Sequence, residues 1–194
     1  ARKEASKLNV PRIGVRFRLP ASMNQVEYFG RGPAENYLDR NAGSMVGLYK
    51  STAEELYFPY VRPQENGHHT DTRWVSLSTG KKGLLIQADN TIGFNALRNS
   101  IEDFDDEEAT GLSRQWSNFT PEQVANHDEA AAKNVLRRQH HINDITPRDF
   151  VEVCVDLKQQ GVAGYDSWGS RPEPAYTLPA NREYNWGFTL IPLK

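Results

Sequence analysis

The residues best suited to bind a ligand lie in one polar stretch near residue 165. The run Gly164-Tyr165-Asp166-Ser167-Trp168-Gly169 places Tyr and Trp between glycines, outside any alternating pattern that would bury them in a core. The flat apolar face of Trp168 suits the C–H face of a sugar ring, and Asp166 and Ser167 could bond its hydroxyls. The same pattern also fits a Trp168 that folds back onto the protein as a lid. The residues alone leave both interpretations open.

Acidic and imidazole side chains could bind a metal. Residues 102–108 hold six carboxylates in seven positions, and calcium prefers oxygen ligands. This stretch lacks the glycine turn and the distal glutamate of an EF-hand, so we predict a solvated acidic loop. The histidines occur as His68-His69, His127 and His140-His141, without the i, i+4 spacing of zinc sites on helices. We therefore predict no metal site and no cofactor.

Common catalytic patterns are missing from the sequence. Gly30-Arg31-Gly32-Pro33 lacks the lysine of a phosphate-binding loop, and no G-x-S-x-G motif of a serine hydrolase occurs. Glycoside hydrolysis by two carboxylates stays open, because any two acids could meet in space. The sequence alone nominates no such pair, and no catalytic residue is assigned to this chain.

Short alternating runs predict the strands that would position these residues. Strands are predicted over residues 13–19, 26–29, 74–77, 84–88, 151–157 and 184–190. The first run and the last two alternate apolar and polar residues with period two, as half-buried strands do. Many short strands with Gly and Pro between them predict an all-β sandwich.

One stretch is helical in pattern. Thr120 is suited to be an N-cap, Pro121 to occupy the first helical position, and Gln123 to complete a capping box. We predict one helix around 120–138, inserted between strands. No internal repeat or Ser/Gly linker is visible, so residues 1–194 are predicted to form a single domain.

Composition excludes several classes of protein. Lys and Arg total 23 against 25 Asp and Glu, a net charge of −2, so no nucleic-acid partner is expected. No apolar run approaches the roughly 20 residues that span a bilayer, and a soluble protein of the cytoplasm or periplasm is expected. The single cysteine, Cys154, cannot form an intrachain disulfide. The start at Ala1, without a Met or a signal region, is interpreted as a cut from a longer protein.

Three segments resemble, in the expected order, motifs of one family. Residues 28–40, YFGRGPAENYLDR, closely resemble the G-x-G-P-x-E-N-Y-x-D-R signature of the C-terminal domain of family 2 β-galactosidases. Residues 59–67, PYVRPQENG, are similar to its P-Y-x-x-P-x-E-N-G motif, and Thr72-Arg73-Trp74 follows at the usual distance. Residues 156–169 resemble its D-x-K-Q-x-G-x-G-G-D-x-S-W-G block. The resemblance runs from about residue 10 to residue 191.

The resemblance implies a β-supersandwich of the galactose-mutarotase-like type, the small-chain domain that is last of five. The parent would be a retaining β-galactosidase whose catalytic carboxylates, about 5 Å apart, lie on a separate (β/α)8 barrel. In the family, the tryptophan that matches Trp168 reaches that active site and stacks on the sugar or aglycone. Asp166 and Ser167 beside it are the other expected substrate contacts. The expected partners are the barrel, the other domains and a β-galactoside; the parent could be a homo-oligomer, and this chain alone is expected to be inactive.

The remaining motif residues are expected to hold the scaffold rather than to bind sugar. Gly30 and Gly32 are expected to permit backbone angles that a Cβ would forbid. Charged motif residues would fix their loop by charge-assisted bonds, and residues 65–67 would form a hydrogen-bonded turn. The structural set is Gly30, Gly32, Glu35, Asn36, Asp39, Arg40, Glu65, Asn66, Gly67 and Arg73.

The sequence departs from the family pattern at two places, and two alternative functions stay open. Ala163-Gly164 followed by Tyr165 stands where the family has two glycines before an aspartate, and residues 103–138 are longer than is typical. A free-standing, mutarotase-like sugar epimerase would need a general acid and base. A purely structural or oligomerisation module would use edge strands and exposed aromatic residues. The candidates are His68, His69, His141 and Glu65 for the first alternative, and Tyr57, Phe58 and Tyr60 for the second.

Overall fold

The structure, a computed structural model, describes residues 8–61, 63–104, 142–166 and 168–194. The chain divides into two compact units. The first comprises residues 1–58, 66–98 and 148–194, and the second comprises residues 59–65 and 99–147. All the strands of the described residues belong to the first unit.

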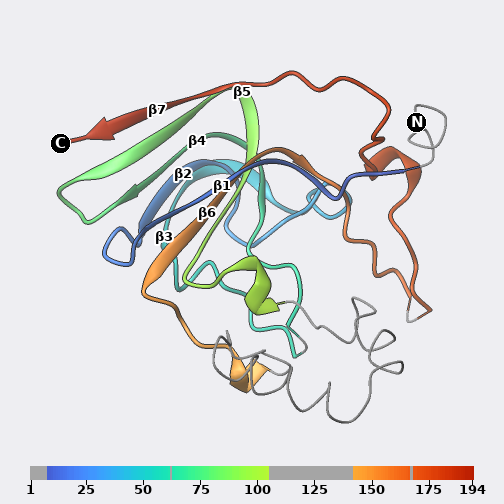
Figure 1. Cartoon of the computed structure of the whole chain (residues 1–194), viewed down its shortest axis with the longest axis horizontal. Helices are drawn as coiled ribbons and strands as arrows, with labels where there is room; N and C mark the ends of the chain where they lie inside the picture. Colours follow the sequence, from blue (N-terminus) through green and yellow to red (C-terminus); the bar gives the residue numbers. More distant parts are fainter. Residues whose placement is uncertain (1–7, 62, 105–141, 167) are drawn as a thin grey trace, which may run out of the picture. The chain divides into compact units, whose positions relative to one another are not determined.

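The first unit is one antiparallel sheet, shown in Figure 1. Its strands are β1 (Arg12–Pro20), β2 (Gln25–Gly32), β3 (Met45–Thr52), β4 (His69–Ser78), β5 (Gly83–Leu97), β6 (Phe150–Gln159) and β7 (Phe188–Leu193). The strand order is β1-β6-β5-β4-β2-β3, and β7 pairs with β5 outside this order. A single-turn helix, η3 (Pro174–Tyr176), lies between β6 and β7. The predicted all-β class is confirmed for the part of the chain that the structure describes.

The two halves of the long strand β5 pair with different strands. Its first half, 83–88, pairs with β7, and its second half, 93–97, pairs with β6. Its neighbour β4 shifts register between His69 and Trp74, where the sheet bends. Strand β5 therefore lies between β6, which precedes the polar stretch near residue 165, and β4, which follows the 59–67 motif.

Strand alternation produces the core on one face of the sheet. Val26 and Tyr28 of β2 lie opposite Leu77 and Val75 of β4, and all four side chains are buried. On β6, residues 151–156 are buried on both faces. Burying apolar surface in this way is the main favourable term in the folding of such a sheet.

The strand predictions were right for the edge strand β1 and the inner strand β6, whereas the last predicted run was only partly a strand and β3 was missed. The 13–19 and 151–157 runs are β1 and β6, but no side chain of β1 is fully buried. The run 184–190 is a strand only from Phe188, and the hydroxyl of Tyr184 donates to the carbonyl of Pro179. Strand β3 was not predicted, because its apolar residues do not alternate cleanly.

The second unit contains two single-turn helices, η1 (Ile101–Phe104) and η2 (Ile142–Asp144). The side-chain amide of Asn99 donates to the carbonyl of Thr146 at 2.9 Å. The predicted helix around 120–138 lies outside the described residues, as do residues 105–108 of the acidic stretch. Asp103 is buried and accepts a bond from the backbone N–H of Ser100 at 2.9 Å. The prediction of a solvated loop is therefore wrong at Asp103, which caps its own turn.

Candidate functional site

The segment that carries Trp168 is attached to the sheet through Asp39. Oδ1 of Asp39 accepts a hydrogen bond from the backbone N–H of Val162 at 3.1 Å, and Oδ2 accepts one from Ala163 at 2.7 Å. The hydroxyl of Tyr165 donates to the same Oδ2 at 3.5 Å. One carboxylate from the 28–40 motif therefore holds the base of the loop that follows β6.

The tip of this loop presents Trp168 to solvent. The Trp168 side chain is 92% exposed, so it is not a lid folded onto the described part of the chain. Its backbone N–H donates to Oδ1 of Asp166 at 2.8 Å, which makes a local Asx-type turn. The backbone N–H of Tyr165 donates to Oγ of Ser170 at 3.1 Å. Ser167 lies outside the described residues.

The carboxylate of Asp39 is held in place by a tight turn. Tyr37 and Arg40 exchange backbone hydrogen bonds across this turn, which contains Asp39. The guanidinium of Arg40 lies over the Tyr37 ring and donates to Oε1 of Glu35 at 2.7 Å. Oε2 of Glu35 accepts the backbone N–H of Gly67 at 2.7 Å. Glu35 and Arg40 thus position the turn, as charge-assisted bonds do.

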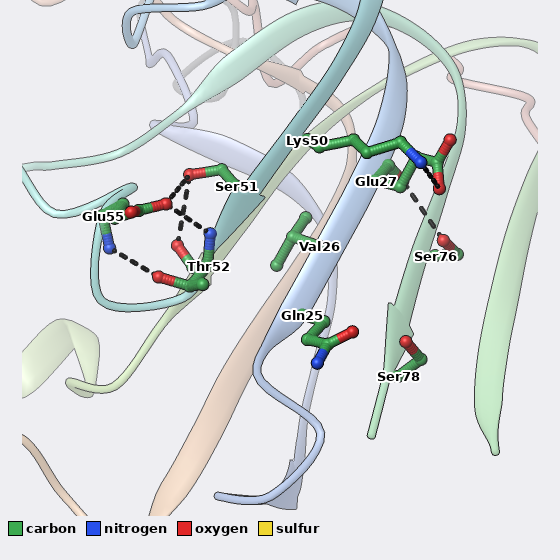
Figure 2. Close-up of a pocket in the computed structure, with 9 residues that line it drawn as sticks. All are labelled: Gln25, Val26, Glu27, Lys50, Ser51, Thr52, Glu55, Ser76 and Ser78. Atoms are coloured by element: carbon green, nitrogen blue, oxygen red, sulfur yellow. Dashed lines mark hydrogen bonds and ion pairs between the residues drawn. The ribbon is translucent and has the colours of Figure 1, made fainter. Parts of the chain in front are cut away.

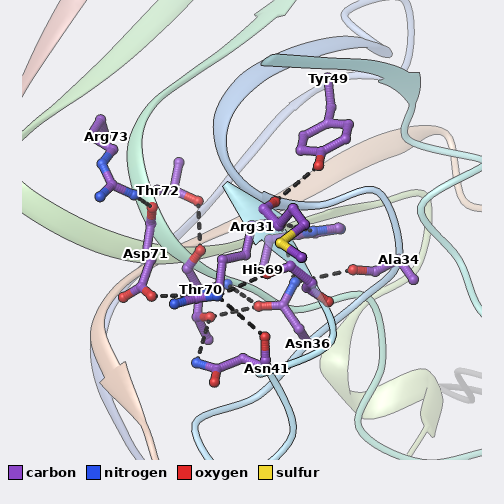
Figure 3. Close-up of polar contacts among 12 residues, drawn as sticks. Arg31, Ala34, Asn36, Asn41, Tyr49, His69, Thr70, Asp71, Thr72 and Arg73 are labelled. Carbon is purple, nitrogen blue, oxygen red and sulfur yellow. Dashed lines mark hydrogen bonds and ion pairs between the residues drawn. The ribbon is translucent and has the colours of Figure 1, made fainter. Parts of the chain in front are cut away.

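Asn36 is the centre of the polar network drawn in Figure 3. Its side-chain amide donates to the carbonyls of Arg31 and Ala34, both at 3.1 Å. Its side-chain oxygen accepts from the backbone N–H and the hydroxyl of Thr70, at 2.9 and 2.6 Å. The side chain is fully buried and uses both of its polar atoms within the protein. It has no polar atom left for a sugar in this structure.

Arg31 and Arg73 lie beside this network. Arg31 pairs with Asp71 at 2.5 Å and also donates to the carbonyl of Ser44 at 2.8 Å. Arg73 donates to the carbonyl of Asp71 (Figure 3). Its guanidinium lies over the Phe29 ring. Arg31 therefore joins β2 to β4 and to the segment before β3, and Arg73 packs on the ring of a β2 residue.

The motif glycines allow close packing. A Cβ at Gly30 would lie 2.4 Å from Oγ1 of Thr72, and a Cβ at Gly32 would lie 2.4 Å from the Tyr28 hydroxyl. Neither residue has a positive φ, so the expectation of special backbone angles is wrong at these two positions. Gly67 does have a φ of 67°, which an L side chain rarely adopts.

The 65–67 turn is built mainly around Asn66. The Asn66 side chain accepts the backbone N–H of Phe58 at 2.8 Å and donates to its carbonyl at 2.5 Å. The backbone carbonyl of Asn66 accepts a hydrogen bond from the side-chain amide of Asn95 at 2.6 Å. Glu65 is half-buried. The motif thus fixes the backbone that leads into β4.

A second buried polar cluster was not predicted from the sequence. Arg12 pairs with Asp156 at 3.1 Å and donates to the side-chain oxygen of Asn95 at 2.9 Å. The same Asn95 oxygen lies 2.8 Å from Nδ1 of His68. Arg12, Asn95 and Asp156 come from β1, β5 and β6, and His68 directly precedes β4, so only the tertiary structure brings them together. The alternating run 151–157 offered no signal for this burial, because Asp156 occupies a polar position of the pattern as Glu152 does.

The adjacent histidines are buried and neutral. Burial, together with the nearby Arg12 guanidinium, lowers the pKa of His68 to about 3. Burial likewise lowers the pKa of His69 to about 4. His69 donates from Nδ1 to the carbonyl of Arg31 at 3.1 Å, and its ring stacks on Phe94. Neither imidazole is accessible to a sugar, which removes two of the four candidate residues for an epimerase; His141 lies outside the described residues.

Figure 2 shows a polar groove of about 430 Å³ formed by β2, β3 and β4. Thr52 and Glu55 bond each other reciprocally between side chain and backbone N–H, at 3.1 and 3.2 Å, as in a capping box. Lys50 pairs with Glu27 at 3.4 Å. No aromatic side chain lines this groove, so it offers no platform for a sugar ring. Among the described residues, no His, Cys, Asp and Glu side chains gather as a metal site would.

These observations describe a rigid sheet with one aromatic loop tip, and the comparisons identify its family. A family model described as "Beta galactosidase small chain" matches residues 1–190. The chain belongs to the beta-galactosidase small chain family. A β-galactosidase of Priestia megaterium is 35% identical over 185 residues, which cover 95% of this chain and 15% of that protein. A β-galactosidase of Vibrio cholerae is 29% identical over 181 residues, which cover 93% of this chain and 14% of that protein.

This chain covers only a small part of the length of its relatives. It spans about 15% of the β-galactosidases of Priestia megaterium and Vibrio cholerae. A third relative, from Arthrobacter sp. (strain B7), is 42% identical over 99 residues, 48% of this chain and 10% of that protein. No helix within the described residues has the length and apolar character needed to cross a membrane.

Proposed function

We propose that this chain is a non-catalytic, carbohydrate-contacting domain of a retaining β-galactosidase. Its loop around Trp168 completes an active-site cleft whose catalytic carboxylates lie on a separate (β/α)8 barrel. The chain by itself does not hydrolyse galactosides. Trp168 contributes an apolar platform for the sugar or aglycone on the leaving-group side, and Asp166 and Ser167 flank that platform.

The observation that carries this proposal is the exposure of Trp168 on an anchored loop. The Trp168 indole is 92% exposed, and covering its apolar surface with a partner would be favourable because that surface would leave water. Its loop is held by two backbone hydrogen bonds to Asp39, so the ring projects from a fixed base. A ring presented in this way can receive a sugar ring with little loss of conformational entropy.

The family resemblance also supports a finer description of the fold. The bent sheet, in which β5 pairs with β6 in one half and with β7 in the other, is compatible with a β-supersandwich of the galactose-mutarotase-like type. In that proposal the exposed apolar residues of β3, among them Met45 and Leu48, pack against other parts of the parent enzyme. This contact adds a structural role to the same domain.

The proposal is tested in the full-length parent enzyme with the variant Trp168→Ala. Loss of the aromatic platform is expected to weaken binding of an acceptor such as glucose by about fivefold to tenfold, equivalent to about 1 kcal/mol. Galactose inhibition should change little, because the variant leaves the barrel intact. Acceptor affinity is measured from the partition of the galactosyl group between water and added glucose.

Two controls accompany this variant. Trp168→Phe keeps a flat ring and should retain most of the acceptor affinity, whereas Trp186→Ala removes an indole that packs on Phe188, away from the loop. Unchanged acceptor partitioning in Trp168→Ala would refute the proposed role. Turnover of an aryl β-galactoside by the purified 194-residue chain would refute the non-catalytic assignment.

A further inference from the structure

The base of the Trp168 loop has a conformation that its own sequence does not favour. Ala163 has a φ of 56° and Gly164 has a φ of 84°, so two consecutive residues lie in the left-handed region. An alanine there is disfavoured by contact of its Cβ with the following carbonyl. Such a residue persists when surrounding contacts over-determine it.

Those contacts come from Asp39. Both carboxylate oxygens accept backbone N–H groups, one from Val162 and one from Ala163 itself. Gly161 makes the approach possible, because a Cβ there would lie 2.4 Å from Oδ2 of Asp39. The backbone N–H of Gly161 is also bonded, to the carbonyl of Tyr176 at 2.8 Å. Asp39 thus joins the loop to the 28–40 motif at the point where the chain reverses.

The loop tip has few other attachments among the described residues. Trp168 is bonded through its backbone to Asp166, and Tyr165 to Ser170, all within the loop. Tyr165 reaches back to Asp39 through its hydroxyl. The direction in which the indole projects is consequently determined by how the base of the loop is held.

We propose that Asp39 is a positioning residue for the acceptor site: it holds the 161–165 backbone in the conformation that places the Trp168 ring against the aglycone. This inference rests on the proposed function of Trp168. Asp39 itself does not touch substrate, and it acts through the loop. Its replacement therefore alters acceptor binding and leaves binding of the galactose ring to the barrel unchanged.

The test uses Asp39→Asn in the full-length parent enzyme. An asparagine presents an NH₂ group where one carboxylate oxygen accepted a backbone N–H, so at least one of the two bonds is lost. Acceptor affinity for glucose should fall about threefold to tenfold. The matched control is Asp71→Asn, which makes the same substitution at a carboxylate that pairs with Arg31 and lies outside the hydrogen bonds that hold the loop.

A double-mutant cycle separates positioning from a general loss of structure. If Asp39 acts through Trp168, then Asp39→Asn added to Trp168→Ala should cause no further loss of acceptor affinity. Additive losses would overturn the proposal, as would an Asp39→Asn effect no larger than that of Asp71→Asn. If Trp168→Ala alone leaves acceptor affinity unchanged, the proposed function fails first, which is a distinguishable result.

A second variant tests the same contact if Asp39→Asn does not fold. Gly161→Ala keeps every polar group, and Gly161 has no positive φ, so alanine is compatible with its backbone. Its Cβ forces Oδ2 of Asp39 away from the loop. Acceptor affinity should again fall about threefold to tenfold, with unchanged galactose inhibition. Wild-type acceptor partitioning in Gly161→Ala would overturn the proposal.

Discussion

The backbone N–H of Ala163 donates a 2.7 Å hydrogen bond to Oδ2 of Asp39, which precedes it by 124 positions in the sequence. This bond joins the 28–40 motif to the block that contains Trp168. The two motifs are therefore parts of one structural unit. The first motif provides the hydrogen-bonding carboxylate of Asp39, and the second provides the backbone N–H groups that it binds and the side chain of Trp168. The left-handed conformation of Ala163 is maintained by this contact.

Ala163→Gly should stabilise the chain. Glycine adopts a φ of 56° without a Cβ clash, so the free energy of unfolding is expected to rise by about 1 kcal/mol. Urea denaturation followed by far-UV circular dichroism measures the change. Ala34→Gly is the matched control: Ala34 is exposed and has no positive φ, so the same substitution should lower the free energy of unfolding by about 0.5–1 kcal/mol. Equal effects at both positions would show that Ala163 carries no strain.

Asn36→Asp should destabilise the fold. The carboxylate would point oxygen atoms at the carbonyls of Arg31 and Ala34, where the amide now donates two bonds. Because the side chain is fully buried, the free energy of unfolding should fall by about 3 kcal/mol. Asn181→Asp makes the same change at an exposed position and should be nearly neutral. If Asn36 were a sugar ligand instead, the variant would lose sugar affinity while its stability stayed close to wild type.

Stability should fall as the pH drops below about 6.5. The pKa values of His68 and His69 are lowered by burial to about 3 and about 4, so both are neutral in the folded protein. The unfolded chain binds protons at these side chains from pH 6.5 downward, while the folded chain does not. Each histidine thus removes about 1.4 kcal/mol of stability per pH unit below 6.5, until its folded pKa is reached. Above pH 6.5 their contribution is constant.

Chemical denaturation between pH 7.5 and pH 5 measures this dependence. The variant His69→Gln removes one of the two groups, so the slope of unfolding free energy against pH should fall by about half the histidine contribution. An unchanged slope in His69→Gln would mean that its imidazole is accessible to protons in the folded state. The comparison must be made at constant ionic strength, because surface charges also titrate.

Part of the candidate site could be predicted from local sequence, and part could not. The sequence allowed either an exposed Trp168 or a Trp168 folded back onto the protein. An exposed position was one of these two interpretations because an aromatic residue between glycines in a polar run has no strand pattern to bury it. No local sequence pattern indicated the hydrogen bonds between Asp39 and the loop, because strands β3 to β6 lie between the two segments in the sequence. The role of Gly30 and Gly32 was also misjudged: the atoms that exclude a Cβ belong to Thr72 on the neighbouring strand β4 and to Tyr28 on the same strand.

The buried cluster of Arg12, Asp156 and His68 shows the same limit. Asp156 lies in the predicted run 151–157, whereas Arg12 begins β1 one residue before the predicted run 13–19. Only the antiparallel pairing of β1 with β6, and of β6 with β5, brings a charge from each into one desolvated cluster. A buried ion pair of this kind needs its partner, because a lone charge there would be strongly destabilising.

The sequence by itself determined the strand periodicity, the family and the residue types of the loop, because these depend on neighbours along the chain. Only the tertiary structure decided which carboxylate holds the Trp168 loop, which histidines are sequestered and which glycines are required for packing. The physical reason is that hydrogen bonding and desolvation depend on distance in space. In an antiparallel sheet with the order β1-β6-β5-β4-β2-β3, that distance is determined by register and not by separation in sequence.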